Sequence, residues 1–405
     1  MKKVFVTLMS ATAVAALASP AAAKAGDPIP LGEDLVLDIL ANARLRYEAV
    51  DQDNIAAGAD AVTVRGRLGA ELKTGNWSLL VEGEGTTALV DHYNDTIPGN
   101  GVEPYPVVAD ADSLELNRAQ VSWIKDGTGF TLGRQRINLD NQRFVGAVGW
   151  RQNEQTFDAL RLQGKTHGLK LDVTYATSQR TVFGTDSPNE HYDGDIVLLN
   201  AGGKVAGADL SAFGYLIDYE TRAAFSSQTY GLLAQRTFPF GPATKVTVLA
   251  SYARQQDFGL NPKDYGVDYL NLELAGAHKG FTLGAGYELL GSANGAAAFQ
   301  TPLATLHAFN GWADLFLTTP AAGLQDYYLK AGYTPPRPPV PGLNFAVQYH
   351  RFEADFGPAS YGNEWDASIG FKLGQVALLA KFARYNADSF GTDTSKVWLQ
   401  AEYGF

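Results

Sequence analysis

The last nine residues of the chain alternate between two faces, and this pattern constrains the fold more than any other feature of the sequence. Apolar side chains occupy every second position of 397–405, with Trp398, Gln400, Glu402 and Gly404 between them. A period of two places successive side chains on opposite faces of a β-strand. Chain ends in soluble proteins usually fray into polar residues. The sequence therefore predicts a terminal strand with one wholly apolar face.

Hydrophobic residues are abundant, but they are distributed in alternation rather than in long runs. The chain is 45% hydrophobic and 11% aromatic, yet after the N-terminal segment no run of about 18 apolar residues could form a spanning helix. Only helices and closed barrels satisfy every backbone group in lipid. Barrels do so with strands of about ten residues that are apolar toward lipid and polar toward the lumen. We therefore predict an all-β fold, a transmembrane antiparallel up-and-down β-barrel in the bacterial outer membrane.

Short turns and longer gaps alternate along the chain, and this rhythm gives a strand count. The longer gaps lie near 90–112, 138–155, 177–194, 219–227, 255–267, 291–325, 355–364 and 386–395. Outer-membrane barrels have short periplasmic turns and longer extracellular loops. We predict about 18 strands, an even number that puts both ends of the barrel on the periplasmic side. Segments 113–124, 130–137 and 156–164 alternate poorly, so bulges or contacts with the wall are expected there.

The N-terminal segment predicts a secretory signal peptide over residues 1–23. Lys2 and Lys3 are followed by an apolar stretch at 4–18 and by small residues at 19–23. This order of a positive region, an apolar core and a small-residue cleavage region is that of a signal peptide. A transmembrane helix is the alternative, but the apolar core is short for one. The barrel is accordingly expected over residues 24–405.

Arginine is concentrated in the first part of the chain, on the predicted lumen-facing side of the strands. Ten of the 17 arginines lie between residues 44 and 161. The predicted pore-lining side chains are Arg44, Arg46, Arg65, Arg67, Glu82, Glu84, Arg118, Arg134 and Arg161. Guanidinium groups stay charged and bind carboxylates with two hydrogen bonds, so one hypothesis is a path for anions. The alternative is an Arg–Glu ladder that neutralises itself and stiffens the wall.

The longest gap, residues 291–325, contains too many apolar side chains for an exposed loop. We predict that it enters or caps the lumen and sets the constriction. The candidate constriction residues are Phe299, His307, Phe309, Asn310, Trp312 and Asp314. A contact with another subunit or with lipopolysaccharide is the alternative. Residues 143–153 have the same character.

Several motifs resemble the alginate-export family of outer-membrane barrels. They are Gly133-Arg134-Gln135, the sequence QRFVG at 142–146, WRQN at 150–153, Thr156-Phe157-Asp158 and FQTPLATLHAFNGWAD at 299–314. The resemblance covers nearly the whole chain after the signal segment. It implies an eighteen-stranded barrel with an arginine-rich pore that passes anionic polysaccharide, alginate or uronate-like saccharides. Family members that are porins for small solutes are the alternative.

The terminal strand resembles the C-terminal signal of bacterial outer-membrane barrels, with Tyr403 and Phe405 as its last aromatic residues. That resemblance implies recognition by the barrel-assembly machinery. The expected partners are this machinery, outer-membrane lipid and lipopolysaccharide, and small anionic or saccharide solutes.

No motif for catalysis is visible in the sequence. G-x-S-x-G and H-E-x-x-H do not occur, and the six histidines are scattered without partners at ligand spacing. Cysteine is absent, which excludes thiolate sites. No enzyme activity, cofactor, metal or nucleic-acid partner is predicted. Three hypotheses remain: a channel for anionic saccharides or other small anions, a general diffusion porin for small hydrophilic solutes, and a plugged structural or surface barrel.

Overall fold

The computed structural model describes residues 26–405, and their regular structure is almost entirely β-strand. The predicted signal peptide, residues 1–23, lies outside the described residues. No helix in 26–405 is long and apolar enough to cross a membrane. The elements are β1 (Ile29–Pro30), β2 (Leu35–Gln52), β3 (Ala59–Thr74), β4 (Trp77–His92), β5 (Ser113–Lys125), β6 (Thr128–Gln135), β7 (Thr156–Thr166), β8 (Leu169–Arg180), β9 (His191–Val205), β10 (Ala208–Tyr219), η1 (Ala223–Phe225), β11 (Ser227–Pro239), β12 (Thr244–Asp257), β13 (Gly266–His278), β14 (Phe281–Leu290), η2 (Leu306–Ala308), β15 (Leu324–Tyr333), β16 (Asn344–Glu353), β17 (Ser360–Leu373), β18 (Val376–Ala387) and β19 (Thr394–Gly404).

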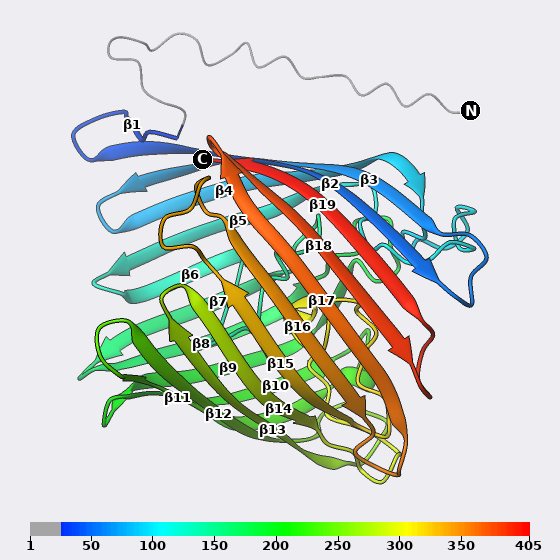
Figure 1. The fold of residues 1–405 in the computed structure, drawn as a ribbon. Coiled ribbons are helices and arrows are strands. Elements are labelled where there is room, and N and C mark those ends of the chain that lie inside the picture. The colour runs from blue at the N-terminus through cyan, green and yellow to red at the C-terminus, as the bar shows by residue number, and fades with distance from the viewer. Residues whose placement is uncertain (1–25) are drawn as a thin grey trace.

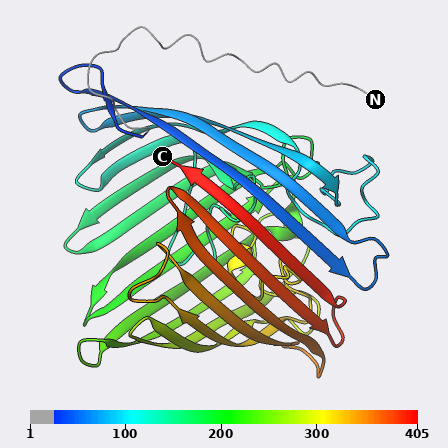
Figure 2. The same ribbon diagram turned by 45° about the horizontal axis from the view of Figure 1, so that its top comes forward.

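The 18 strands β2 to β19 form one closed antiparallel barrel. Each strand pairs with its neighbours in sequence, and β19 closes the ring on β2, from Thr394 opposite Gln52 to Gly404 opposite Asn42. The short β1 pairs with the start of β2. Short turns and the C-terminus lie at one end of the barrel, and the long loops lie at the other (Figure 1, Figure 2). The predicted fold class and strand number are confirmed.

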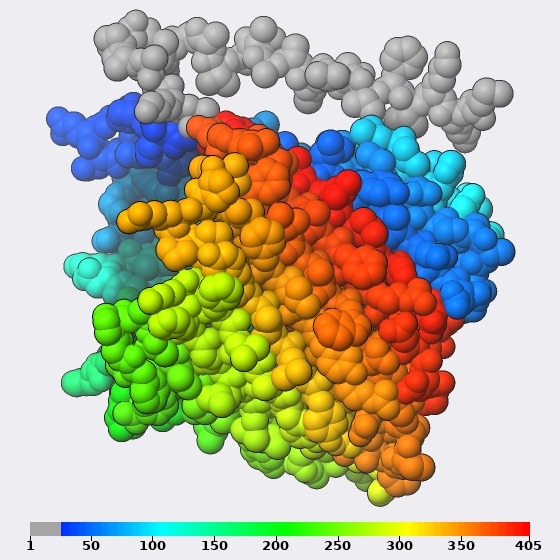
Figure 3. All heavy atoms as spheres, in the orientation of Figure 1, coloured from blue at the N-terminus to red at the C-terminus, as the bar shows by residue number. Residues whose placement is uncertain are grey.

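The outer face of the barrel is apolar, with aromatic rings near both ends. Leu283 in β14 is 67% exposed on this face. On the same face, Phe281 and Tyr333 stack with ring centroids 4.2 Å apart near the short turns. Tyr287 and Tyr327 lie 4.9 Å apart nearer the long loops. Figure 3 shows the outside of β15–β19 as a continuous surface. An apolar band between aromatic girdles is the surface that an outer-membrane barrel presents to lipid.

Register shifts occur beside two of the three segments for which bulges or wall contacts are predicted. The pairing of β4 with β5 slips beside Glu82, and the pairing of β7 with β8 slips beside Asp158. The first bulge lets the neighbouring side chains Asn117 and Arg118 both reach Glu82, each at 2.9 Å. The segment 130–137 contains β6, which pairs without a register shift, so no bulge forms in these pairings.

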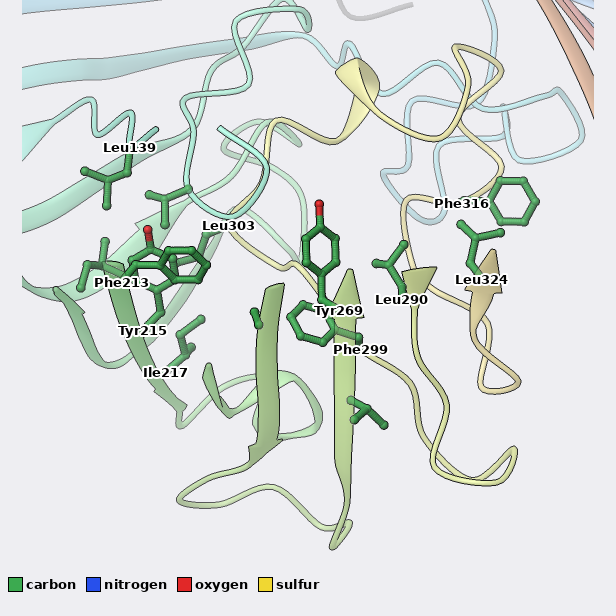
Figure 4. Packing of buried hydrophobic residues seen from close by; sticks show 14 of the residues in the cluster. Leu139, Phe213, Tyr215, Ile217, Tyr269, Leu290, Phe299, Leu303, Phe316 and Leu324 are labelled. Carbon is green, nitrogen blue, oxygen red and sulfur yellow. The ribbon is translucent and has the colours of Figure 1, made fainter. Parts of the chain in front are cut away.

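Two long loops fold into the barrel and make its hydrophobic core. They are residues 136–155, between β6 and β7, and residues 291–323, between β14 and β15, which we call the first and second inner loops. The loops meet where the Gly146 N–H donates to the Leu303 carbonyl at 2.9 Å. Phe299 is fully buried and packs 5.4 Å from Tyr269 of the wall, ring to ring (Figure 4). The core therefore lies inside the lumen, between the inner loops and the wall.

Candidate functional site

The arginines of β2 and β3 face the lumen, and carboxylates hold them there. Arg44 and Arg65 lie 3.0 and 3.1 Å from the carboxylate of Glu402. Arg46 lies 3.3 Å from Asp110. The side chains of Arg46 and Arg65 are completely buried. Removing a charge from water is unfavourable unless the charge is paired and hydrogen-bonded, so these contacts explain how the wall accommodates guanidinium groups.

The same pairing continues along the wall from β3 to β8. Arg67 pairs with Glu84 and Glu154, Arg118 and Arg136 pair with Glu82, and Arg161 pairs with Asp172. Glu82 and Glu84 thus face the lumen and act as counter-charges to the arginines. We call this row of paired side chains on the lumen-facing side of β2 to β8 the arginine wall. Its positive and negative charges neutralise one another.

Arg134 departs from the prediction, because it lies on the outer face of the barrel. Its register partner in β7 is Asp158, and the preceding pair on that face is Leu132 with Leu160. Those two leucines are 51% and 40% exposed. Side chains two residues apart on a strand share a face, and Arg134 Nε lies 2.7 Å from Asp158 Oδ1. The prediction that Arg134 lines the pore is wrong, since the poor alternation of β6 concealed which face the side chain occupies.

The arginine wall also holds the first inner loop. Arg44 donates hydrogen bonds of 3.1 Å to three consecutive carbonyl oxygens of the loop, those of residues 149–151. The guanidinium of Arg46 lies over the ring of Trp150, 4.2 Å from its centroid. A planar guanidinium over an indole face is a favourable cation–π contact. The wall is therefore a docking surface for the loop as well as a row of charges.

His307 joins the second inner loop to the first loop and to the wall. Its ring stacks on Trp150 with centroids 4.3 Å apart. Its Nδ1 lies 2.8 Å from Asp314, and its Nε2 lies 2.6 Å from Lys381 Nζ. Burial lowers the pKa of His307 to about 3, against the opposing effect of Asp314. The imidazole is therefore neutral near pH 7, donates from Nδ1 to Asp314 and accepts from Lys381.

Three further residues of the second inner loop contact the wall or the first inner loop. They are Phe309, Asn310 and Trp312. Lys381 Nζ lies 3.7 Å from the ring centroid of Trp312. The guanidinium of Arg143, from the first inner loop, lies 4.8 Å from the centroid of Phe309 and donates to Asn310 Oδ1 at 3.0 Å. The candidate constriction residues are thus placed where the two inner loops meet each other and the wall.

At the long-loop end, above the inner loops, the barrel holds a cavity of about 380 Å³, which we call the vestibule. Its lining carries three cationic side chains, Arg151, Arg222 and Lys396, and one carboxylate, Asp314. A smaller cavity of about 50 Å³ lies on the other side of the loops. Segment 306–314 contributes side chains to both cavities, so it stands between them.

Sequence reasoning misses Arg222 and Lys396. Arg222 lies in a short connection after β10, and Lys396 is one polar residue of the terminal strand. Neither has a local pattern that marks it, because only the closed fold brings these distant segments to one cavity. Within residues 26–405 no cluster of three or more His, Asp or Glu side chains could hold a metal ion.

Comparison with known proteins agrees with this architecture. The sequence profile of the family described as alginate export matches residues 36–205. OccAB4 of Acinetobacter baumannii superposes with a TM-score of 0.74 at 16% identity, over 92% of this chain and 98% of that one. OccK9 (OpdG) of Pseudomonas aeruginosa gives 0.72 at 15% identity, over 91% and 98%. The outer membrane protein OpdK of Pseudomonas aeruginosa gives 0.69 at 14% identity, over 91% and 98%. No curated protein matches the sequence.

These findings define the fold class as a closed 18-stranded antiparallel β-barrel of the kind found in outer-membrane porins. More particularly, the predicted resemblance to the alginate-export family is confirmed over residues 36–205. The fold as a whole is shared with the Occ and Opd barrels.

Proposed function

We propose that the protein is a passive outer-membrane channel that prefers small anionic solutes. The observation that carries this proposal is the net charge around the vestibule. Among the described residues, the cations Arg151, Arg222 and Lys396 have only Glu48 and Asp314 as ion-pair partners, which leaves one positive charge in excess. A cavity of one sign with low-dielectric walls concentrates the opposite ion. His307 adds no charge there near pH 7, because burial keeps its pKa near 3. Uronate-like saccharides, which the family resemblance implies, are one class of such anions.

A general diffusion porin is the second candidate. The neutralised arginine wall favours it, since each arginine that faces the lumen there has a carboxylate partner. Such a wall adds little net field, so any selectivity has to come from the vestibule.

The test is the reversal potential of the refolded barrel in a planar bilayer across a salt gradient. We expect an anion-preferring potential that Lys396→Gln moves toward zero, because the substitution removes one vestibule cation. Lys372→Gln, an exposed lysine near the short-turn end of β17, is the matched control and should leave the potential unchanged. A potential near zero in the unaltered barrel would favour the general porin. Absence of current, also after deletion of residues 297–318, would favour a plugged barrel.

A further inference from the structure

One arginine on the outer face of the barrel has no counter-charge. Arg236 is an exposed residue of β11 and lies directly opposite Val248 of β12. It shares its face with Leu232, which is 62% exposed toward lipid. Among residues 26–405 Arg236 forms no ion pair and donates no hydrogen bond. Its guanidinium lies over the ring of Phe238, 4.7 Å from the centroid.

Four other arginines of the outer face each have an aspartate partner. Arg384, for example, lies directly opposite Trp365, which is 51% exposed. The pairs are Arg134 with Asp158, Arg254 with Asp268, Arg351 with Asp388 and Arg384 with Asp393. A charge on the lipid-facing side of a barrel is unfavourable, and these pairs neutralise it within the protein. The counter-charge of Arg236 has to come from outside the protein.

The guanidinium of Arg236 lies at the level of the short turns. The strand β11 ends at Pro239, three residues beyond Arg236. A Cβ placed on Gly207, in the turn between β9 and β10, would lie 3.7 Å from Arg236 NH2. Arginines near the ends of membrane spans extend their charged groups to the headgroup region. Because short turns mark the periplasmic end of outer-membrane barrels, Arg236 faces the headgroups of the periplasmic leaflet.

A hollow of about 190 Å³ lies beside Arg236 on the outer face. It is formed where β10, β11 and β12 lie side by side (Figure 1). Ala234 and Ala250 face each other across two of these strands and, with Ala208, leave the wall thin between Phe238 and Val248. A hydrocarbon chain that enters such a hollow gains dispersion contacts on several sides. The hollow therefore suits one acyl chain, next to a cation at headgroup level.

We propose that Arg236 and this hollow form a binding site for one anionic glycerophospholipid of the periplasmic leaflet. The planar guanidinium donates to two oxygens of the lipid phosphate, and an acyl chain of the same lipid lies over Ala234 and Ala250. No carboxylate lines the described hollow, so the ammonium of a zwitterionic headgroup finds no partner there and competes with Arg236 for the phosphate. The inference concerns the outer wall and does not depend on the proposed channel function.

Native mass spectrometry of the full barrel, released from detergent micelles, tests the site. The probes are phosphatidylglycerol and phosphatidylethanolamine with identical acyl chains, so that only the headgroup charge differs. We expect the first phosphatidylglycerol to bind about fivefold more tightly than phosphatidylethanolamine, since one arginine near an anionic lipid contributes about that much. Equal binding of the two lipids would overturn the anionic class.

Variants of Arg236 test the anchor. Arg236→Gln should weaken the binding of the first phosphatidylglycerol about tenfold, because a charge-assisted hydrogen bond is lost. Arg236→Lys should weaken it less, since it keeps the charge and loses the fork. The matched control is Lys125→Gln, an exposed cation at the short-turn end of β5 that forms no ion pair in the described part of the chain. Equal losses in Arg236→Gln and Lys125→Gln would mean general attraction to a charged rim and would overturn the site.

A substitution in the hollow tests the place of the acyl chain. Ala234→Leu fills the hollow and keeps Arg236, so phosphatidylglycerol should bind about threefold more weakly as contacts with the chain are lost. Ala367→Leu adds the same volume to the outer face of β17, two positions from Trp365, and should have no effect. Unchanged affinity in Ala234→Leu would overturn the placement of the chain. Should Arg236→Gln not fold, Arg236→Lys and Ala234→Leu decide, each against its control.

Discussion

The arginine wall and the vestibule use the same side chain in opposite ways. In the wall, Arg46 is completely buried, pairs with Asp110 and supports Trp150 of the first inner loop. In the vestibule, Arg222 is oriented by the neutral Asn189 and has no carboxylate partner among the described residues. A buried ion pair contributes little net electric field. Removal of one of its partners destabilises the protein, because the other charge is left buried and unpaired. The partners of an arginine, more than its position inside a barrel, therefore decide whether it builds structure or attracts anions.

The largest expected effect comes from breaking the wall. Arg46→Leu leaves Asp110 buried without its partner and removes the support under Trp150. Loss of one member of a buried pair typically costs about 3–5 kcal/mol, so the first inner loop should undock. Amide hydrogen exchange over residues 136–155 should become faster and the conductance should rise.

Arg222→Gln is the control for the hydrogen-exchange experiment on Arg46→Leu, because it changes an arginine of the vestibule instead of one in the arginine wall. This substitution should change exchange over 136–155 by the equivalent of less than about 0.5 kcal/mol. Unchanged protection of 136–155 in Arg46→Leu would show that the wall does not hold the loop.

An intermediate effect is expected from acid, through the contact that joins the loops to the wall. The docked His307 has a pKa of about 3, whereas an undocked histidine titrates near 6.5. As the pH falls below about 6.5, the undocked loop takes up a proton that the docked loop excludes, so docking weakens, by at most about 1.4 kcal/mol per pH unit, until about pH 3. The protection of amides in residues 300–316, measured relative to the intrinsic exchange rate at each pH, should accordingly fall between pH 7.5 and 5.

His307→Gln is the variant that isolates this dependence. It removes the titrating ring, so the difference in amide protection between pH 7.5 and 5 should shrink even if docking is weaker at both values. An equally steep pH dependence in the variant would assign the effect to another group.

The smallest effect is expected on the outside of the barrel. Arg134 and Asp158 form an ion pair on the outer face, so the double substitution Arg134→Gln with Asp158→Asn removes both charges without leaving one unpaired. Stability should change by no more than about 1 kcal/mol, and the reversal potential should stay where it is. A shift in reversal potential would place this pair on the ion path after all.

The sequence predicts the regular parts of this molecule well and the non-local parts poorly. Alternation and turn spacing suffice for the barrel and its 18 strands, because period and strand length follow directly from lipid on one side and water on the other. Arg134 is misplaced since β6 has only eight residues and alternates poorly. The counter-charges are harder still: Glu402 lies more than 300 positions from Arg44 and Arg65 in sequence. The sequence does not predict the role of Arg222 for the same reason, because the segments that line the vestibule meet only in the closed barrel.

The position of β19 links the closure of the barrel to the docking of the first inner loop. This strand carries both the seam with β2 and the Glu402 carboxylate that pairs with Arg44 and Arg65. It also supplies Trp398, whose ring lies 5.8 Å from that of Trp150. The strand that closes the wall therefore also supplies part of the surface on which the first inner loop docks. Loss of β19 would remove the seam and these contacts together, so an opening in the wall is expected to come with a loosened first inner loop.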